Sequence, residues 1–332
     1  MTWFQDLTGF VELPYPQTQA ALNLQGQDLV TPHQRWHIGP FELPSLAELR
    51  QRVAKAEPGP TGAVRLGRVV GDVKKLHRRP EFAGAVFQVA SQFNMLEMPS
   101  YAVTPEAGVA GYAGDPTQGP ACAQAAGAAT VFRNYLVRVG PNGQLGGPGD
   151  QRGQTASLQL DGLGDVGRAL ATQLDCNITD LWRMQNGYAL LTLPALTRVA
   201  AHLQGLGEPE RDALRQLLRV GWHADTQVTH TGAGSEQRVA QVFCSALPVS
   251  YCNLPANAPW QPLAQLVLEA TYEATLLLGR LHQLETGQNT VLLTRVGGGV
   301  FGNEGHWIDA AVARALAIVA DTGLDVRSVV YG

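Results

Sequence analysis

The stretch Val291-Leu-Leu-Thr-Arg-Val-Gly-Gly-Gly-Val-Phe-Gly-Asn303 decides the fold, and an amphipathic segment follows it at 307–316. Its apolar first half predicts a buried strand, and the later segment predicts a helix. A glycine-rich turn between a strand and a helix exposes backbone N–H groups, which favour an anion such as phosphate. Each glycine costs about 1 kcal/mol relative to alanine, so a turn needed for steric reasons alone is the weaker explanation. We therefore expect a nucleotide-like ligand at this loop.

The same loop also matches the dinucleotide-binding pattern Gly-x-Gly-x-x-Gly, at Gly297, Gly299 and Gly302. Asp321 lies at about the distance expected of a ribose-binding acid. That pattern belongs to the first strand–helix–strand unit of its fold, however, and only 30 of the 332 residues follow Gly302. These residues are too few to form the remaining strands and helices of such a fold, so a dinucleotide-dependent oxidoreductase is the weaker interpretation.

The composition is that of a globular chain with a substantial core: 45% of its 332 residues are hydrophobic and 16% are charged. With 24 basic and 28 acidic residues the net charge is −4, so nucleic acid is not expected as a primary partner. No stretch has the pattern of a signal peptide or membrane span, which predicts a cytoplasmic protein without a membrane partner. The four cysteines form no Cys-x-x-Cys pair and no metal-ligand spacing occurs, so we expect no disulfide framework, metal or cofactor.

The order of elements predicts one elaborated domain. Residues 1–60 predict an extension packed on the core, in which Ser45 and Glu48 have the spacing of a helix capping box. In the domain at 61–332, the stretch from about 140 to 238 predicts an insertion of a glycine-rich loop and helices at 162–175, 195–204 and 209–219. The other expected helices are at 121–129, 262–284 and 307–316. The expected strands are at 64–70, 85–91, 131–139, 239–246, 291–296 and 326–331. Strands separated by helices predict an α/β three-layer sandwich with a mixed sheet.

Ligands of such sheets bind beyond the carboxyl ends of the strands. Three expected strand ends carry polar or glycine-rich residues, at Gly71-Asp72, Phe93-Asn94 and Gly297 to Asn303. Together with two further segments they resemble, in order and spacing, five elements of the macrodomain family, the ADP-ribose-binding fold. These five elements are Gly71-Asp72-Val73, Val86 to Asn94, Glu106-Ala-Gly-Val-Ala110, Val242 to Tyr251 and Gly297 to Gly302. The last is most similar to the glycine loop of poly(ADP-ribose) glycohydrolases. The resemblance covers roughly residues 64–139 and 239–331.

The resemblance implies a set of ligand contacts. Asp72 would accept a hydrogen bond from the adenine amine, Asn94 would contact the distal ribose, and Phe301 would pack against that ribose. The diphosphate would lie on the two loops that contain Gly108, Val109, Gly297, Gly298, Gly299, Val300 and Gly302. Taken as isolated residues, Asp72 could equally be a helix cap, Asn94 could stabilise a turn, and Phe301 could plug the edge of the sheet.

Hydrolysis of an ADP-ribosyl bond needs a carboxylate or an activated water at the anomeric carbon. The glycohydrolase branch has Gln-Glu-Glu after its glycine loop, whereas the stretch from Gly111 to Cys122 of this chain lacks the paired glutamates. Asp115 is the acid best placed to replace the absent glutamates, as general acid/base or to orient the water. Glu97 and Glu106 are weaker candidates. Asp115-Pro116 is also an ordinary start for a turn.

The predicted function is therefore recognition of ADP-ribose or an ADP-ribosylated protein, with hydrolysis of the ADP-ribosyl linkage as an extension. The first alternative is a non-catalytic reader of ADP-ribose or a related nucleotide. The second is an unrelated cysteine-dependent enzyme. Cys122 would lie in the first turn of a helix, where the dipole lowers the pKa of a thiol, although a small packed residue explains it as well. Its partner would be one of His77, His223, His230 and His306.

Overall fold

The computed structural model describes residues 2–230 and 236–331. At its centre lies a seven-stranded sheet. In spatial order the strands are β4 (Phe41–Glu42), β11 (Gly221–Gln227), β12 (Arg238–Cys244), β6 (Val86–Ala90), β13 (Thr290–Leu293), β14 (Asp325–Val330) and β5 (Arg65–Val70). The five strands from β12 to β5 are parallel, whereas β11 is antiparallel to both of its neighbours. The predicted α/β fold with a mixed sheet is confirmed.

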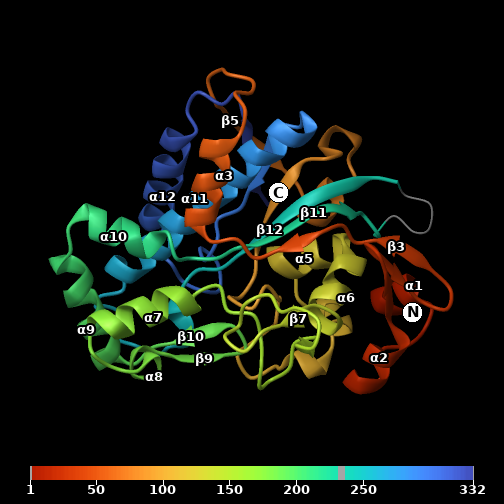
Figure 1. Cartoon of the computed structure of the whole chain (residues 1–332), viewed down its shortest axis with the longest axis horizontal. Coiled ribbons are helices and arrows are strands. Elements are labelled where there is room, and N and C mark those ends of the chain that lie inside the picture. The colour runs from red at the N-terminus through yellow and green to blue at the C-terminus, as the bar shows by residue number, and fades with distance from the viewer. Residues whose placement is uncertain (1, 231–235, 332) are drawn as a thin grey trace.

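Helices cover both faces of this sheet (Figure 1). Alternate residues of the central strands belong to two separate apolar clusters, because successive side chains of a strand point to opposite faces. Val86 and Val291 pack with the helices of one face, and Phe87 and Leu292 pack with those of the other. The first layer contains α3 (Leu46–Lys55), α11 (Gln261–Thr286) and α12 (Gly305–Ile318). The second contains α4 (Val73–Leu76), α5 (Gln118–Ala125) and α6 (Gly127–Tyr135).

The strand predicted at 131–139 is wrong. Residues up to Tyr135 form α6, and only the short strand β7 (Arg138–Val139) follows, paired with β8 (Gln151–Arg152). Val131 and Tyr135 favour a strand by intrinsic propensity, but both are fully buried on a helix that packs against the core. Tertiary packing therefore overrides the local preference.

The first part of the chain contributes to the core as well as to a separate end of the molecule. Short helices α1 (Trp3–Thr8) and α2 (Tyr15–Ala21) precede a small sheet, β1 (Asn23–Gln25), β2 (Asp28–Val30) and β3 (Arg35–His37). After β4 joins the central sheet, the predicted capping box begins α3: Glu48 N–H donates to Ser45 Oγ, and Ser45 N–H donates to Glu48 Oε2.

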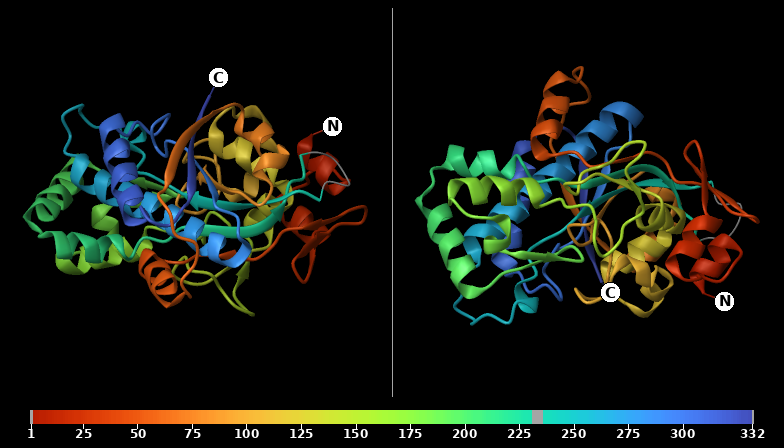
Figure 2. Two further views of the ribbon diagram at one scale, coloured as in Figure 1. Left: turned by 90° about the horizontal axis from the view of Figure 1, so that it is seen from above. Right: turned by 60° about the horizontal axis from the view of Figure 1, so that its bottom comes forward.

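A group of helices from the expected insertion lies at the end of the molecule opposite the N-terminal segment (Figure 2). It contains α7 (Gly164–Gln173), α8 (Ile178–Leu181), α9 (Leu193–Gly205), α10 (Glu208–Arg215) and the hairpin of β9 (Arg183–Gln185) and β10 (Tyr188–Leu190). Residues 221–227 are hydrogen-bonded within the central sheet as β11. The division into an extension at 1–60, a core domain and an insertion at about 140–238 stays a prediction.

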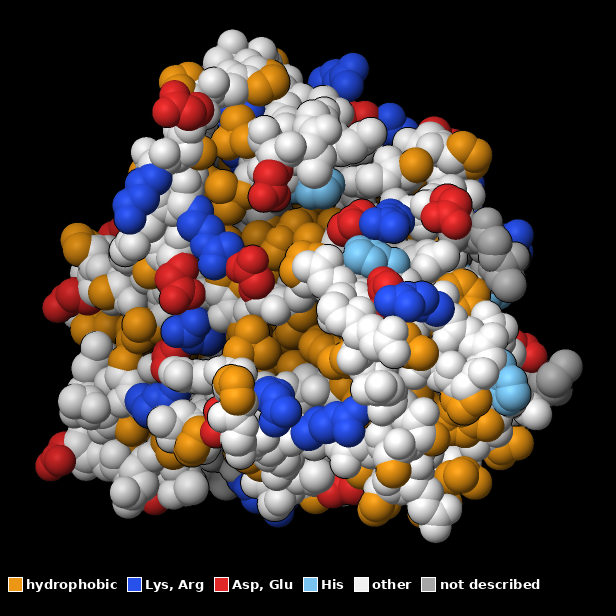
Figure 3. Space-filling model, turned by 45° about the vertical axis from the view of Figure 1, so that its right-hand side comes forward, with side chains coloured by type: hydrophobic (Ala, Val, Ile, Leu, Met, Phe, Trp, Pro, Cys, Tyr) orange, Lys and Arg blue, Asp and Glu red, His pale blue; other side chains and the backbone are white. Residues whose placement is uncertain are grey.

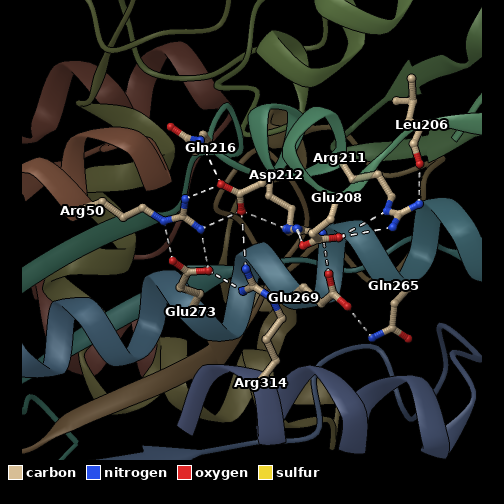
Figure 4. Close-up of polar contacts among 11 residues, drawn as sticks. Arg50, Leu206, Glu208, Arg211, Asp212, Gln216, Gln265, Glu269, Glu273 and Arg314 are labelled. Atoms are coloured by element: carbon tan, nitrogen blue, oxygen red, sulfur yellow. Dashed lines mark hydrogen bonds and ion pairs between the residues drawn. The ribbon is translucent and has the colours of Figure 1, made fainter. Parts of the chain in front are cut away.

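An ion-pair network ties α10 to the helices on one face of the sheet (Figure 4). Its centre is Glu273 of α11, whose carboxylate accepts hydrogen bonds from Arg50 of α3 and Arg314 of α12. Arg50 also binds Asp212 of α10 through two hydrogen bonds. The side chain of Glu273 is only 2% exposed. The network thus connects four helices through one buried carboxylate and partly exposed partners.

The outer surface carries both signs of charge. On the face drawn in Figure 3, acidic and basic side chains are interspersed, without a large area of a single sign. Among the described residues, no helix is long and apolar enough to cross a membrane.

Candidate functional site

A cavity of about 330 Å³ lies beyond the carboxyl ends of the parallel strands. Ala90 at the end of β6, Thr294 directly after β13 and Tyr331 directly after β14 all line it. The first residues of α5, beginning with Gln118, form another wall. Open α/β sheets bind their ligands in this position, and the volume falls within the range of small-molecule sites. This cavity is the candidate functional site.

The glycine loop after β13 forms one side of the cavity. Gly297, Gly299, Val300 and Phe301 line it. The loop is closed by internal turns, in which the N–H groups of Gly302 and Asn303 donate to carbonyls of the loop itself. Among the described residues, the N–H groups of the four lining residues have no acceptor. Such a run of free N–H groups is suited to bind an anion.

Steric reasons explain some of the glycines and not others. Gly297 has φ = 76°, and a Cβ there would lie 2.4 Å from the Cβ of Ala246. Gly302 has φ = 75°, and a Cβ there would lie 2.1 Å from Ser250 Oγ. At Gly299 a Cβ would meet nothing within 4 Å. The steric explanation thus accounts for the first and last glycines of the loop and leaves Gly299 unexplained.

An aromatic group stands beside the loop. The ring of Phe301 lies 5.3 Å from that of Tyr188 and 5.5 Å from that of Tyr251, and all three residues line the cavity. Tyr188 belongs to β10, and its hydroxyl donates to Met98 O at 2.9 Å. The sequence did not predict that Tyr188 or Tyr251 faces a ligand. No motif surrounds Tyr188, and the segment from Val242 to Tyr251 indicated no ligand contact for its tyrosine. The group offers an apolar surface to a ring or a sugar.

Asp115 lines the cavity, in the turn before α5. Its Oδ1 accepts hydrogen bonds from Thr117 N–H at 2.8 Å and from Thr117 Oγ1 at 2.6 Å. The sequence allowed Asp115 either a role in a turn or a place at the ligand site. In the structure its carboxylate stabilises a turn, and the residue also lines the cavity.

Glu97 also lines the cavity, and its surroundings are unusual for a carboxyl group. The side chain is fully buried, and among the described residues neither of its oxygens has a hydrogen-bond partner. Arg133 Nη2 lies 3.6 Å from Oε1, beyond hydrogen-bond distance. Burial raises the pKa of this carboxyl to about 8, although the Arg133 guanidinium acts in the opposite direction. The sequence placed Glu97 below Asp115, because burial cannot be read from the surrounding residues. Glu106, the other weaker candidate, does not line the cavity and accepts a hydrogen bond from Ala156 N–H.

The loop around Gly108 and Val109 does not line this cavity. The N–H groups of Val109 and Ala110 each donate to the carboxylate of Glu12 at 2.8 Å. A Cβ on Gly108 would lie 2.5 Å from the same carboxyl group. These N–H groups do hold an anion, as the pattern of the loop suggests, but in the structure that anion is a side chain of the protein itself.

The other residues expected at the site make contacts within the protein. Asn94 is fully buried, and its amide donates to Gln159 Oε1 and accepts from Leu96 N–H. Asp72 caps α4 by accepting from Lys74 N–H. Neither residue lines the cavity, and neither do Gly298 and Gly302. Asp72 nevertheless lies at the same edge of the sheet, because the neighbouring Gly71 N–H donates to Val330 O, one residue before Tyr331.

Cys122 does not have the surroundings of a nucleophile. It is fully buried on α5, and burial raises the pKa of its thiol well above the ordinary value. His77 is also buried, which lowers its pKa to about 4. A thiolate is thus disfavoured at neutral pH, and the packed-residue interpretation fits better. Within residues 2–230 and 236–331, no group of three or more His, Cys, Asp and Glu side chains is arranged to hold a metal ion.

Comparison with known proteins gives similarity in structure only. No family model matches this chain, and no curated protein does. Among solved structures, the chain is similar to the poly(ADP-ribose) glycohydrolase of Thermomonospora curvata, with 13% identity and a TM-score of 0.43 over 91% of this chain and 87% of the other. For the enzyme of Deinococcus radiodurans in complex with ADP-ribose the identity is 11% and the TM-score 0.44, over 88% and 87%. These structures belong to the branch that the sequence motifs resemble.

Proposed function

We propose that the cavity binds ADP-ribose or an ADP-ribosyl group and that the protein hydrolyses the ADP-ribosyl linkage. The observation that carries the proposal is the row of N–H groups at Gly297, Gly299, Val300 and Phe301, which lines the cavity and has no acceptor among the residues that the structure describes. A diphosphate offers several oxygens to such donors. Arg295 also lines the cavity, where its guanidinium forms an ion pair with Asp309.

The two ends of the cavity suit the rest of the ligand. We place the distal ribose against Phe301, because the aromatic group with Tyr188 and Tyr251 provides an apolar surface next to the loop. The adenine would then extend toward Tyr331 and the edge of the sheet where Asp72 lies. The amide of Asn94 makes its hydrogen bonds within the protein, so the proposal assigns it no ligand contact. The proposal also omits Gly108 and Val109, because Glu12 occupies their loop.

Two carboxyl groups at the cavity support hydrolysis. Asp115 and Glu97 both line it, and acid/base chemistry at an anomeric carbon needs such groups. A non-catalytic reader is the second candidate, favoured by the two hydrogen bonds that tie Asp115 Oδ1 to Thr117. Turnover of an ADP-ribosylated substrate separates the two candidates. An ADP-ribosylated protein as partner and a cytoplasmic location stay predictions.

Phe301→Ala tests the placement of the ribose. We expect it to weaken ADP-ribose binding by about 1 to 3 kcal/mol, the usual cost of losing one buried stacking contact. Calorimetric titration with ADP-ribose measures the change. Val300→Ala is the matched control: its side chain is 58% exposed, and the substitution keeps the backbone N–H. Equal affinities of Phe301→Ala and the wild type would remove Phe301 from the proposed site.

A further inference from the structure

Gly119 lies in the stretch where the resemblance leads one to expect a pair of glutamates, and it has no room for a side chain. Gln118 clamps the start of α5 to β6, since its amide accepts from Ala90 N–H and donates to Gln88 O, both at 2.9 Å. The clamp brings Gly119 so close to the strand that a Cβ there would lie 2.0 Å from Ala90 O. The next neighbour of that Cβ would be Glu97 Cγ at 3.1 Å. A carboxyl group from another segment of the chain therefore lies beside the backbone that lacks one.

We infer that Glu97 is the general acid of the hydrolysis, supplied by the segment after β6 in place of an acid on α5. The inference rests on the proposed function. It goes further by naming the residue that gives its proton to the leaving group.

The surroundings of Glu97 favour a proton donor. Its oxygens are shielded from water and lack partners among the described residues, so a buried polar group is left unsatisfied. Glu97 lines the cavity, so its carboxyl group meets a substrate oxygen once the side chain turns toward the cavity. The charged and titratable groups around it are Arg133 of α6, Cys122 of α5 and Tyr112 in the turn at 110–114. With a pKa of about 8, the carboxyl group holds its proton at neutral pH.

Arg133 is held by contacts other than Glu97. Its Nε donates to Met95 O and its Nη2 donates to Thr130 Oγ1, both at 3.1 Å. The guanidinium also lies 3.5 Å from the centre of the Phe243 ring. The separation of 3.6 Å between Arg133 and Glu97 is thus set by the surrounding core. We regard Arg133 as a positioning residue.

The proposed step balances with water as the only co-reactant. The Glu97 carboxyl transfers its proton to the leaving oxygen, and the bond between that oxygen and the anomeric carbon breaks, with its electron pair going to the oxygen. Water adds to the anomeric carbon, and its proton passes to the Glu97 carboxylate. Asp115, whose Oδ1 is held by Thr117, is better suited to orient this water than to donate a proton.

Glu97→Gln tests the inference, because glutamine keeps the shape of the side chain and removes the proton. We expect release of ADP-ribose from poly(ADP-ribose) to slow by about 10²- to 10⁴-fold, while the affinity for free ADP-ribose changes by less than about threefold, well under 1.4 kcal/mol. Wild-type turnover should fall as the pH rises above about 8, and that fall should be absent in the variant. Thermal unfolding checks that the variant is folded, and Glu97→Asp, which retains a proton, should recover part of the rate.

A second substrate distinguishes an acid from a merely structural residue. Nitrophenolate leaves without a proton, so Glu97→Gln should lose much less activity on 4-nitrophenyl ADP-ribose than on poly(ADP-ribose). Equal losses on both substrates, or full activity of the variant, would overturn the inference. Binding of ADP-ribose by a wild type that turns over neither substrate would also overturn it and leave the binding proposal standing. Failure of the wild type to bind ADP-ribose would instead refute the proposed function.

Discussion

Glu273→Ala is expected to lower the free energy of unfolding by about 3 kcal/mol, at the lower end of the cost of breaking a buried ion pair. The carboxylate is almost fully buried and holds two guanidinium groups, with Arg50 Nε and Arg314 Nη1 each at 2.5 Å. Removing it leaves both cations without their central partner (Figure 4). Their side chains are 29% and 27% exposed, so water compensates in part. Both cations keep Asp212 as a partner, so the loss comes from the missing central carboxylate.

Denaturant unfolding at neutral pH measures this change. Glu42→Ala is the control, because the pair of Glu42 with Arg52 is over 40% exposed on both sides and should contribute less than about 1 kcal/mol. Hydrogen bonds from Arg50 hold the pKa of Asp212 below its ordinary value of 3.8. A carboxyl group whose pKa is lowered by folding stabilises the folded state at a pH above its ordinary pKa, here 3.8. The contribution of Asp212 to the free energy of unfolding should therefore decline as the pH falls below 3.8. Equal stabilities of Glu273→Ala and Glu42→Ala would contradict the role given to the network.

Gly297→Ala is expected to weaken ADP-ribose binding by at least tenfold, or about 1.4 kcal/mol. The residue has φ = 76°, a conformation that costs an L-residue about 1 to 2 kcal/mol. The new Cβ would also lie 2.4 Å from Ala246 Cβ and 2.7 Å from the amide nitrogen of Asn303. Relief of this contact has to move the loop, and with it the N–H groups proposed to hold the diphosphate.

Gly299→Ala is the matched control in the same loop. Its φ is not in the left-handed region, and a Cβ would meet nothing within 4 Å. The substitution should therefore leave the fold of the loop unchanged, and any loss of affinity reports contact of the ligand with this position. Calorimetric titration of both variants with ADP-ribose, after a check of thermal stability, gives the comparison. A Gly297→Ala variant that binds as tightly as the wild type would show that the loop geometry is not needed for the ligand.

Much of the fold could be predicted because its signals are local. The apolar run at 291–296 and the capping box at Ser45 each depend on residues close together in sequence, and both elements are present. The strand expected at 131–139 failed because burial of Val131 and Tyr135 on a helix depends on distant partners such as Tyr15, which packs on Tyr135. Local preference decides an element only where packing does not oppose it.

The candidate site shows the same limit. The glycine loop and Asp115 were found from the sequence, because a loop and a turn carry their own residue patterns. Glu97 ranked low, since the absence of partners around a buried carboxyl appears only in three dimensions. The loop at Val109 was expected to bind phosphate, and no sequence rule indicated that Glu12, 97 positions away, would occupy it. Contacts between distant segments therefore account for the differences between the expected and the observed site.

Calorimetric titration of the wild-type protein with ADP-ribose, with AMP as a control, tests the central claim most directly. The account predicts saturable binding of ADP-ribose with one site per chain, and clearly weaker binding of AMP, which lacks the second phosphate and the distal ribose. It also predicts that Phe301→Ala reduces the first affinity and leaves the second nearly unchanged, because Phe301 is placed at the distal ribose. No binding of ADP-ribose, or equal binding of AMP, would contradict the assignment of the cavity.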